Sequence, residues 1–228
     1  MQNIIVSYKK LILSFLIGLS LIAPVICFIF YRSRPTPYGL ALCFFILFHS
    51  IFRIWETFFT SKEKDTFVIS DDGTLVLVTF AYVFLFYLVM TEFYLTGRSI
   101  NLAISGSGLL IYVAAFRLRW WGMAALGKQW AIHAIGKKKI EHKRLITLGP
   151  YQYIRHPIYT ATLLELLGVV LIANAYMTIL YFLFLTIPAY FMRIRVEELN
   201  NIKIFGQQYK KYRKTTGMVF PRIRKKES

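Results

Sequence analysis

Cysteine is nearly absent from this sequence, and its scarcity limits the kinds of protein that the chain can be. The two cysteines among 228 residues, Cys27 and Cys43, both lie inside apolar runs. We interpret them as small buried hydrophobic residues and not as a disulfide. No cysteines have the spacing of a metal site, and the four histidines are mostly scattered. The sequence therefore predicts no bound metal and no disulfide-stapled scaffold.

Acidic residues are also scarce. The chain has 11 Asp and Glu against 28 Lys and Arg, a formal net charge of +17, while 57% of its residues are hydrophobic. A soluble domain rarely combines such apolarity with so much charge, whereas a membrane protein separates the two into apolar spans and basic surface segments. The basic residues flank the apolar runs, where they meet lipid head groups and set topology. We therefore expect a lipid bilayer, and no nucleic acid, as the partner.

Six apolar stretches approach or reach the length of a membrane-crossing helix. They cover residues 11–31, 38–59, 75–94, 100–116, 158–173 and 176–191. Asn174 separates the cores of the last two, which are predicted to form a tight helical hairpin, with Pro188 kinking the second arm. Arg53 and Glu56 lie three residues apart on one face of the second stretch and can pair. The predicted fold is an all-α, polytopic membrane bundle of about six segments with a cytoplasmic cofactor pocket.

The composition of the chain changes near residue 117. Residues 1–116 hold the first four spans, whereas residues 117–228 hold a long basic segment, the hairpin and a strongly basic tail. We expect the two parts to form a single functional domain. Lysine and arginine concentrate in 117–156 and 203–226, so both segments are predicted to be cytoplasmic. Counting back through four spans places the N-terminus on the same side as the C-terminus.

Two polar clusters bracket the hairpin. RHPIY, Arg155–Tyr159, precedes it, and RIRVEEL, Arg193–Leu199, follows it. Because a hairpin returns the chain to the membrane face that it left, the two clusters are expected to meet. The sequence therefore predicts a pocket with cationic and hydrogen-bonding groups on one wall and the carboxylates of Glu197 and Glu198 on the other.

The chemistry of this predicted pocket suits a zwitterionic ligand with an aromatic ring. Arg155 or His156 can hold a carboxylate. Glu197 or Glu198 can hold an ammonium group, and nearby tyrosines can pack on a ring or a sulfonium. S-adenosylmethionine carries all of these groups. A competing interpretation is that these residues only anchor helix ends at the membrane interface, as arginine, histidine and tyrosine commonly do.

Three motifs make the prediction more specific. The first is LITLGPYQYIRHPIYTATLLELLG, starting at Leu145; the second is VEELNNIKIFGQQYKKY, starting at Val196; the third is the proline of VFPRI, Pro221. In sequence and spacing they resemble the isoprenylcysteine carboxyl methyltransferase family and its relatives, the phospholipid methyltransferases, across about the C-terminal half of the chain. A GSG sequence ending at Gly108 is a weaker candidate. In phospholipid methyltransferases a G-x-G is tied to cofactor binding, but small residues also let helices approach closely.

The resemblance implies an S-adenosyl-L-methionine-dependent membrane methyltransferase with a lipophilic acceptor that enters from the membrane, first of all an isoprenylcysteine-type carboxylate. Glu197 would take the ammonium group of the cofactor. Arg193, one helical turn earlier, would face the acceptor, and Arg155 and Glu198 complete the candidate catalytic group. The other candidate cofactor-binding residues are Lys143, Arg144, Leu145, Ile146, Tyr151, His156, Pro157, Ile158 and Tyr159.

Three alternatives stay open. The first is a phospholipid or small-molecule N- or S-methyltransferase, in which Glu198 or a histidine would help to deprotonate an amine acceptor. The second is an NADPH-dependent sterol-type reductase, against which Pro157 and the Glu197–Glu198 pair argue. The third is a non-enzymatic scaffold or transporter subunit. A transporter more often carries ionisable groups near mid-membrane, where Arg53, Glu56 and Glu92 are the exceptions in this chain.

Overall fold

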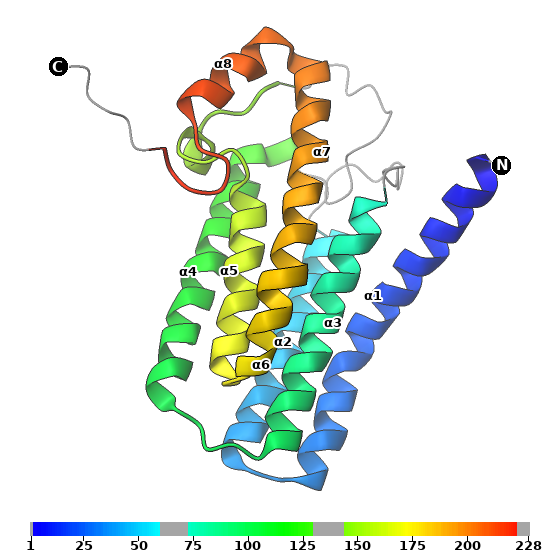
Figure 1. Cartoon of the computed structure of the whole chain (residues 1–228), viewed down its shortest axis with the longest axis vertical. Helices are drawn as coiled ribbons and strands as arrows, with labels where there is room; N and C mark the ends of the chain where they lie inside the picture. Colours follow the sequence, from blue (N-terminus) through cyan, green and yellow to red (C-terminus); the bar gives the residue numbers. More distant parts are fainter. Residues whose placement is uncertain (1, 60–72, 130–143, 223–228) are drawn as a thin grey trace.

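The computed structural model describes residues 2–59, 73–129 and 144–222, which form an upright helical bundle (Figure 1). Its α-helices are α1 (Gln2–Ser33), α2 (Pro37–Phe59), α3 (Thr74–Thr96), α4 (Leu102–Leu126), α5 (Pro157–Ile172), α6 (Tyr176–Tyr181), α7 (Ile187–Phe205) and α8 (Gln207–Thr215). Short 3₁₀ turns cover Gly127–Gln129 and Gly149–Gln152, and a π-helical turn, Phe182–Thr186, joins α6 to α7. Within these described residues the only strand-like pairing is the isolated bridge between Ile154 and Gly217.

Several of these helices are suited to a membrane. Four described helical segments are long and apolar enough to cross one, and two further apolar helices are shorter. The four are Leu11–Ser33, Thr74–Thr96, Leu102–Leu126 and Tyr176–Phe205; the shorter two are Pro37–Arg53 and Pro157–Ile172. The predicted all-helical, multi-pass membrane fold is confirmed at this level, whereas the count of six segments stays a prediction.

Helix α4 is longer than the sequence predicted. The fourth apolar stretch was expected to end at residue 116 and to give way to a basic segment, but the helix continues to Leu126. The reason is Arg119, which looked like the charge of a cytoplasmic segment but is 1% exposed and is paired with buried carboxylates. A neutralised arginine does not end a membrane helix, so the compositional boundary at residue 117 falls inside α4.

The hairpin has the predicted form. Helix α5 leads into a tight turn at Asn174, which adopts a left-handed backbone conformation with φ 53°, a conformation that asparagine tolerates better than most residues. The Asn174 side chain is held on both sides, since it donates to Ser105 Oγ at 2.7 Å and accepts from the Asn101 N–H at 2.8 Å. A π-helical turn ends at Thr186, two residues before Pro188, whose ring removes a helix hydrogen bond.

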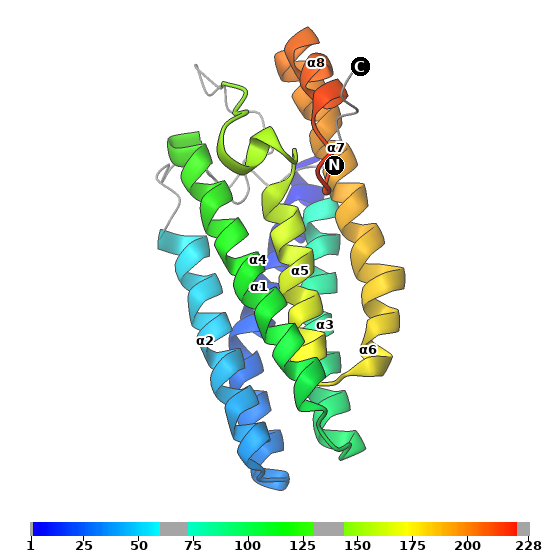
Figure 2. The same cartoon turned by 90° about the vertical axis from the view of Figure 1, so that its left-hand side faces the viewer.

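Helix α4 lies beside α5 along most of its length (Figure 2), and two glycines make this approach possible. A Cβ atom at Gly108 would lie 2.7 Å from Leu171 Cβ and 2.8 Å from the carbonyl oxygen of Gly168. A Cβ atom at Gly168 would in turn lie 2.9 Å from the carbonyl oxygen of Gly108. The geometry thus favours helix packing as the role of Gly108 in the GSG sequence.

We expect Gly108→Ala to lower the free energy of unfolding by about 1–3 kcal/mol, because the added methyl overpacks against the backbone of α5. Gly106→Ala is the matched control on the same helix, since no heavy atom lies within 4 Å of its added Cβ. There we expect a gain of about 0.5–1 kcal/mol from helix propensity. Thermal unfolding of the two variants in detergent measures both effects. Equal midpoints would contradict the close-packing role.

The bundle places the motifs of the C-terminal half at one end. Helix α8 and the upper part of α7 lie at that end, and α1 begins toward it (Figure 1). The start of α5 reaches the same end, so the segments before and after the hairpin come together there. The cytoplasmic location of this end stays a prediction from the distribution of lysine and arginine.

Candidate active site

The two polar clusters that bracket the hairpin meet, as predicted, around the carboxylate of Glu198. Arg155 donates from Nε to Glu198 Oε1 at 2.6 Å, and His156 Nε2 lies 3.3 Å from the same oxygen. Tyr209 of α8 donates its hydroxyl to Oε1 at 3.4 Å, and Arg213 Nε lies 3.3 Å from Oε2. We call these five residues the Glu198 clamp. Because an ionised carboxylate only accepts hydrogen bonds, four donors from two other segments converge on one residue of α7.

The segment after α8 also holds the RHPIY turn in place. The backbone N–H groups of Arg155 and His156 donate to the carbonyl oxygens of Gly217 and Met218 at 2.8 and 3.1 Å. Arg155 additionally donates through Nη1 to the carbonyl oxygen of Thr216. The turn is therefore fixed by backbone and side-chain bonds from residues more than fifty positions later in the chain.

A cavity of about 340 Å³ extends from this clamp into the bundle. It brings together ten of the predicted site residues: Arg144, Leu145, Ile146, Tyr151, Arg155, His156, Ile158, Tyr159, Arg193 and Glu197. Two predicted residues are not part of its lining. Pro157 is buried at the first position of α5, and the Glu198 carboxylate is bound by the other residues of the clamp. Lys143 lies outside the described residues.

The wall formed by residues 144–146 is held by a residue that sequence reasoning missed. The Gln129 side chain accepts from the backbone N–H of Arg144 at 2.7 Å and donates to the carbonyl oxygen of Arg144 at 3.2 Å. This two-bond contact presents the following residues, Leu145 and Ile146, to the cavity. A side-chain amide that pairs with one backbone residue has no fixed spacing, so the sequence pattern did not reveal it.

Tyrosines at this end stay neutral and act as hydrogen-bond donors. Burial raises the pKa of Tyr151 well above its ordinary value, and the nearby charge of Glu197 adds to the effect. Burial likewise raises the pKa of Tyr209 to about 12, with the charge of Glu198 adding to the rise. The Tyr212 hydroxyl donates to the carbonyl oxygen of Tyr151 at 2.5 Å. Helix α8 thereby fixes the backbone of the GPYQ turn.

Arg193 and Glu197 reach the cavity from successive turns of α7. Arg193 donates from Nη1 to Thr74 Oγ1 at 3.0 Å and from Nε to the Tyr159 hydroxyl at 3.4 Å, and it is 1% exposed. Thr74, the first residue of α3, is a partner that the sequence did not indicate, because it lies 119 positions from Arg193.

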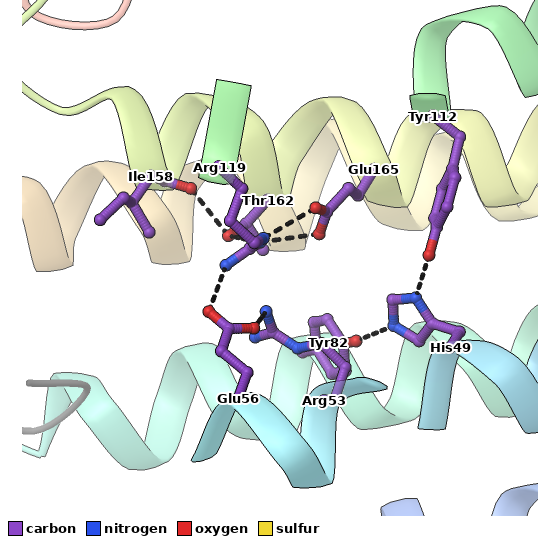
Figure 3. Close-up of polar contacts among 9 residues, drawn as sticks. All are labelled: His49, Arg53, Glu56, Tyr82, Tyr112, Arg119, Ile158, Thr162 and Glu165. Carbon is purple, nitrogen blue, oxygen red and sulfur yellow. Dashed lines mark hydrogen bonds and ion pairs between the residues drawn. The ribbon is translucent and has the colours of Figure 1, made fainter. Parts of the chain in front are cut away.

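Deeper in the bundle, four charged side chains form what we call the charge network: Arg53 and Glu56 of α2, Arg119 of α4 and Glu165 of α5 (Figure 3). Arg119 binds both oxygens of Glu165 at 2.7 Å through Nε and Nη2, and it contacts Glu56 Oε1 at 3.2 Å. The pairing of Arg53 with Glu56, predicted from their spacing, is confirmed at 2.5 Å. The network contains two cations and two anions, so its formal charge is zero.

His49 lies next to the charge network and is packed between two tyrosines (Figure 3). Its Nδ1 lies 2.6 Å from the Tyr112 hydroxyl, and its Nε2 is hydrogen-bonded to the Tyr82 hydroxyl. Both ring nitrogens thus have partners, so His49 is a hydrogen-bonded, packed histidine.

From the charge network the cavity continues along α1 and α3. This part, which we call the apolar arm, is lined mainly by Leu13, Ile17 and Leu21 of α1 and by Leu75, Val78, Val83 and Phe86 of α3. The α3 residues repeat at helical spacing and so form one stripe facing α1. The cavity therefore joins a polar end to an apolar interior.

Fold and cavity together define a multi-pass helical membrane protein whose polar site opens into an apolar arm. That layout suits an enzyme that brings a water-soluble ligand to a membrane-borne one. Among the described residues, no group of three or more His, Cys, Asp or Glu side chains lies together as a metal site would require.

Comparisons with known proteins agree with this class. The model of the isoprenylcysteine carboxyl methyltransferase family matches residues 108–203. A protein-S-isoprenylcysteine O-methyltransferase from Schizosaccharomyces pombe is 25% identical over 203 residues, which cover 82% of this chain and 86% of the relative. A methanethiol S-methyltransferase from Crocosphaera subtropica is 25% identical over 192 residues, which cover 80% and 72%.

The fold has a counterpart among solved structures. The structure of the eukaryotic intramembrane Ras methyltransferase, an isoprenylcysteine carboxyl methyltransferase, superposes with a TM-score of 0.57 at 22% sequence identity, covering 96% of this chain and 84% of that one. The chain is thus similar to the isoprenylcysteine carboxyl methyltransferase family over residues 108–203, and it shares the fold of an integral-membrane methyltransferase. These similarities favour a methyltransferase over the reductase and scaffold alternatives.

Proposed function

We propose that this protein uses S-adenosylmethionine to methylate a carboxylate on a lipophilic acceptor, of which an isoprenylcysteine is the first candidate. One observation supports this more than any other. The same cavity contains a polar end that carries the motif residues and an apolar arm between α1 and α3. A water-soluble methyl donor and a lipophilic acceptor can therefore meet inside one protein.

The residues at the polar end fit S-adenosylmethionine. Glu197 is a carboxylate that faces the cavity and suits an ammonium group. Tyr151 and Tyr159 offer ring faces to an adenine or a sulfonium. The backbone of residues 144–146, held by Gln129, offers hydrogen bonds along one wall. When bound there, the cofactor supplies a methyl group made electrophilic by a cationic sulfur.

The residues of the chain have positioning tasks in this reaction. A carboxylate acceptor is already a nucleophile at neutral pH, so no side chain has to remove a proton from it. The protein needs to align the reacting groups and to exclude water, which the buried walls of the cavity do. Charge disappears as a carboxylate becomes a methyl ester, and a low-dielectric site favours such a step.

The roles of Glu198 and Arg155 follow from the clamp. Glu198 is not part of the cavity lining and already binds Arg155, so it is poorly placed to act as a base on an acceptor. We propose that both are positioning residues, which hold the turn bearing His156 against α7. Arg193 lines the cavity and keeps its proposed place beside the acceptor.

A second acceptor class is a thiol. The Crocosphaera subtropica relative is named for methanethiol, a small acceptor. Such an acceptor would leave an apolar arm lined by residues of two helices without a use. We therefore rank the lipophilic carboxylate first and include a thiol among the acceptors that are tested.

The test of this proposal is cofactor binding and methyl transfer by purified protein in detergent. Wild-type protein is expected to bind S-adenosylmethionine saturably and to methylate N-acetyl-S-farnesyl-L-cysteine. Glu197→Gln is expected to weaken cofactor binding roughly 10- to 100-fold, the effect of losing a hydrogen bond between charged groups in a buried site.

Arg195→Ala is the control on the same helix, because Arg195 is exposed and is not part of the cavity lining. Its affinity for the cofactor is expected to equal that of the wild type. Transfer to an alkanethiol with none to farnesylcysteine would replace the carboxylate proposal by the thiol one. Undiminished cofactor binding by Glu197→Gln would remove Glu197 from the proposed site.

A further inference from the structure

The four members of the charge network differ in exposure. The side chains of Glu56, Arg119 and Glu165 are 1–2% exposed, whereas that of Arg53 is 28% exposed. Arg53, Glu56 and Arg119 all line the cavity. The Arg53 guanidinium is therefore the most exposed charged group of the network on the cavity wall.

The rest of the network holds this guanidinium in place. Glu56 contacts Arg53 Nη1 at 2.5 Å and is itself held by Arg119. Arg119 is anchored in turn by both oxygens of Glu165 and by Thr162 Oγ1 at 2.6 Å (Figure 3). A positioned arginine presents several N–H donors in a rigid fork, the geometry that matches a carboxylate.

Arg53 also lies at the head of the apolar arm. Its guanidinium carbon is 5.3 Å from the ring centre of Tyr82. Tyr82 belongs to the α3 stripe that includes Val78 and Phe86, which line the arm. A molecule with an anionic head and a long apolar tail would thus find a cation where its tail enters the arm.

We propose that Arg53 binds the carboxylate of the acceptor and makes the protein prefer acidic acceptors to neutral ones of the same shape. The proposal rests on the proposed function and extends it, since it names the residue that selects the acceptor class. Buried charges in a membrane bundle are costly, and apolar replacements often stabilise a fold as well. If the other three charged residues of the network hold Arg53 toward the cavity, that role explains the presence of four buried charges.

The other buried arginines are less suited to this role. Arg119 is 2% exposed and is surrounded by the carboxylates of Glu56 and Glu165. Arg193 is 1% exposed and donates to the hydroxyls of Thr74 and Tyr159. Arg193 can contact the acceptor carboxylate from α7, while Arg53 contacts it from α2.

Binding through Arg53 also has a consequence for the product. An isoprenylcysteine acid carries a negative charge that Arg53 can hold, whereas its methyl ester carries none. The attraction is lost when the ester forms, so the product binds more weakly than the acceptor and can leave through the apolar arm. The same residue would then favour acceptor capture and product release.

The experiment compares binding of the acid and the ester without turnover. Dissociation constants of N-acetyl-S-farnesyl-L-cysteine and its methyl ester are measured by equilibrium dialysis with the full-length protein in detergent. The wild type is expected to bind the acid roughly tenfold or more tighter than the ester. Arg53→Gln is expected to weaken acid binding roughly 10- to 100-fold and to leave ester binding unchanged.

Two further variants separate charge from packing. Arg53→Lys keeps the cation but not the fork, so it is expected to retain a preference for the acid, reduced several-fold. Thr162→Val removes a network hydrogen bond but no charge, and its ratio of acid to ester affinity is expected to equal that of the wild type. These two keep the test decisive if Arg53→Gln does not fold.

Three results would overturn the proposal: equal affinity of the wild type for acid and ester, an unchanged ratio in Arg53→Gln, or a Thr162→Val ratio that falls as far as that of Arg53→Lys. Methyl transfer from labelled S-adenosylmethionine is measured on the same preparations. Its absence in the wild type would count against the proposed function, whereas the binding ratio decides the role of Arg53.

Discussion

Glu198→Ala is expected to destabilise the protein by about 3–5 kcal/mol and to abolish cofactor binding. The variant leaves Arg155, 7% exposed, without the carboxylate that it contacts at 2.6 Å. It also removes the acceptor for His156 and Tyr209. Because these three residues come from the RHPIY turn and α8, losing one carboxylate frees both segments from α7.

Thermal unfolding in detergent and equilibrium binding of S-adenosylmethionine measure this effect. Arg213→Ala is the matched control, because Arg213 contacts the same carboxylate at 3.3 Å but is 42% exposed. An exposed ion pair contributes at most about 1 kcal/mol, so this variant is expected to keep the fold and the cofactor site. If Glu198→Ala unfolds at the wild-type temperature, the clamp does not hold the three segments together.

The meeting of the RHPIY turn with Glu198 could be predicted from the sequence because both flank the hairpin, whereas the contacts of Tyr209 and Arg213 with Glu198 were not predicted. A hairpin returns to the face that it left, so Arg155 and Glu198 had to end on the same side. The motif resemblance then limited the candidate catalytic and cofactor-binding residues to thirteen, ten of which line one cavity. Local spacing was enough to predict the pair of Arg53 and Glu56, three positions apart on one helix.

The charge network as a whole could not be predicted in this way. Arg119 and Glu165 are 46 positions apart, on different helices, and nothing local indicates that they pair. Because Arg119 is charged, the sequence pattern assigns it to a basic cytoplasmic segment. Its burial depends on α4 packing against α5 at Gly108, which brings the two side chains face to face. The same reasoning applies to Thr74, whose contact with Arg193 depends on how α3 and α7 pack.

Arg119→Leu is expected to cost about 3–5 kcal/mol of folding free energy, the largest effect in the charge network. It removes a bidentate partner from Glu165 and leaves two buried carboxylates, Glu56 and Glu165, with Arg53 as their remaining cation in the network. Thermal unfolding in detergent measures the loss. Size-exclusion chromatography of the expressed protein reports whether any folded fraction persists.

The double variant Arg119→Leu/Glu165→Leu separates a cost of unpaired charge from a cost of lost packing. It deletes one cation and one anion, so the pair of Arg53 and Glu56 is left balanced. Replacing both members of a buried pair by apolar residues is often neutral. We therefore expect the double variant to be more stable than either single variant, with a coupling energy of about 1–3 kcal/mol.

The double variant also tests whether the network serves the acceptor. Arg53 and Glu56 remain in it, so the preference for the farnesylcysteine acid over its ester is expected to survive. The preference is expected to be smaller than in the wild type, because Arg119 no longer holds Glu56, which positions Arg53. Stability that fell by the sum of the two single effects would mean that no charge coupling exists. Restored stability with full loss of the acid preference would instead show that Arg53 needs the whole network to face the cavity.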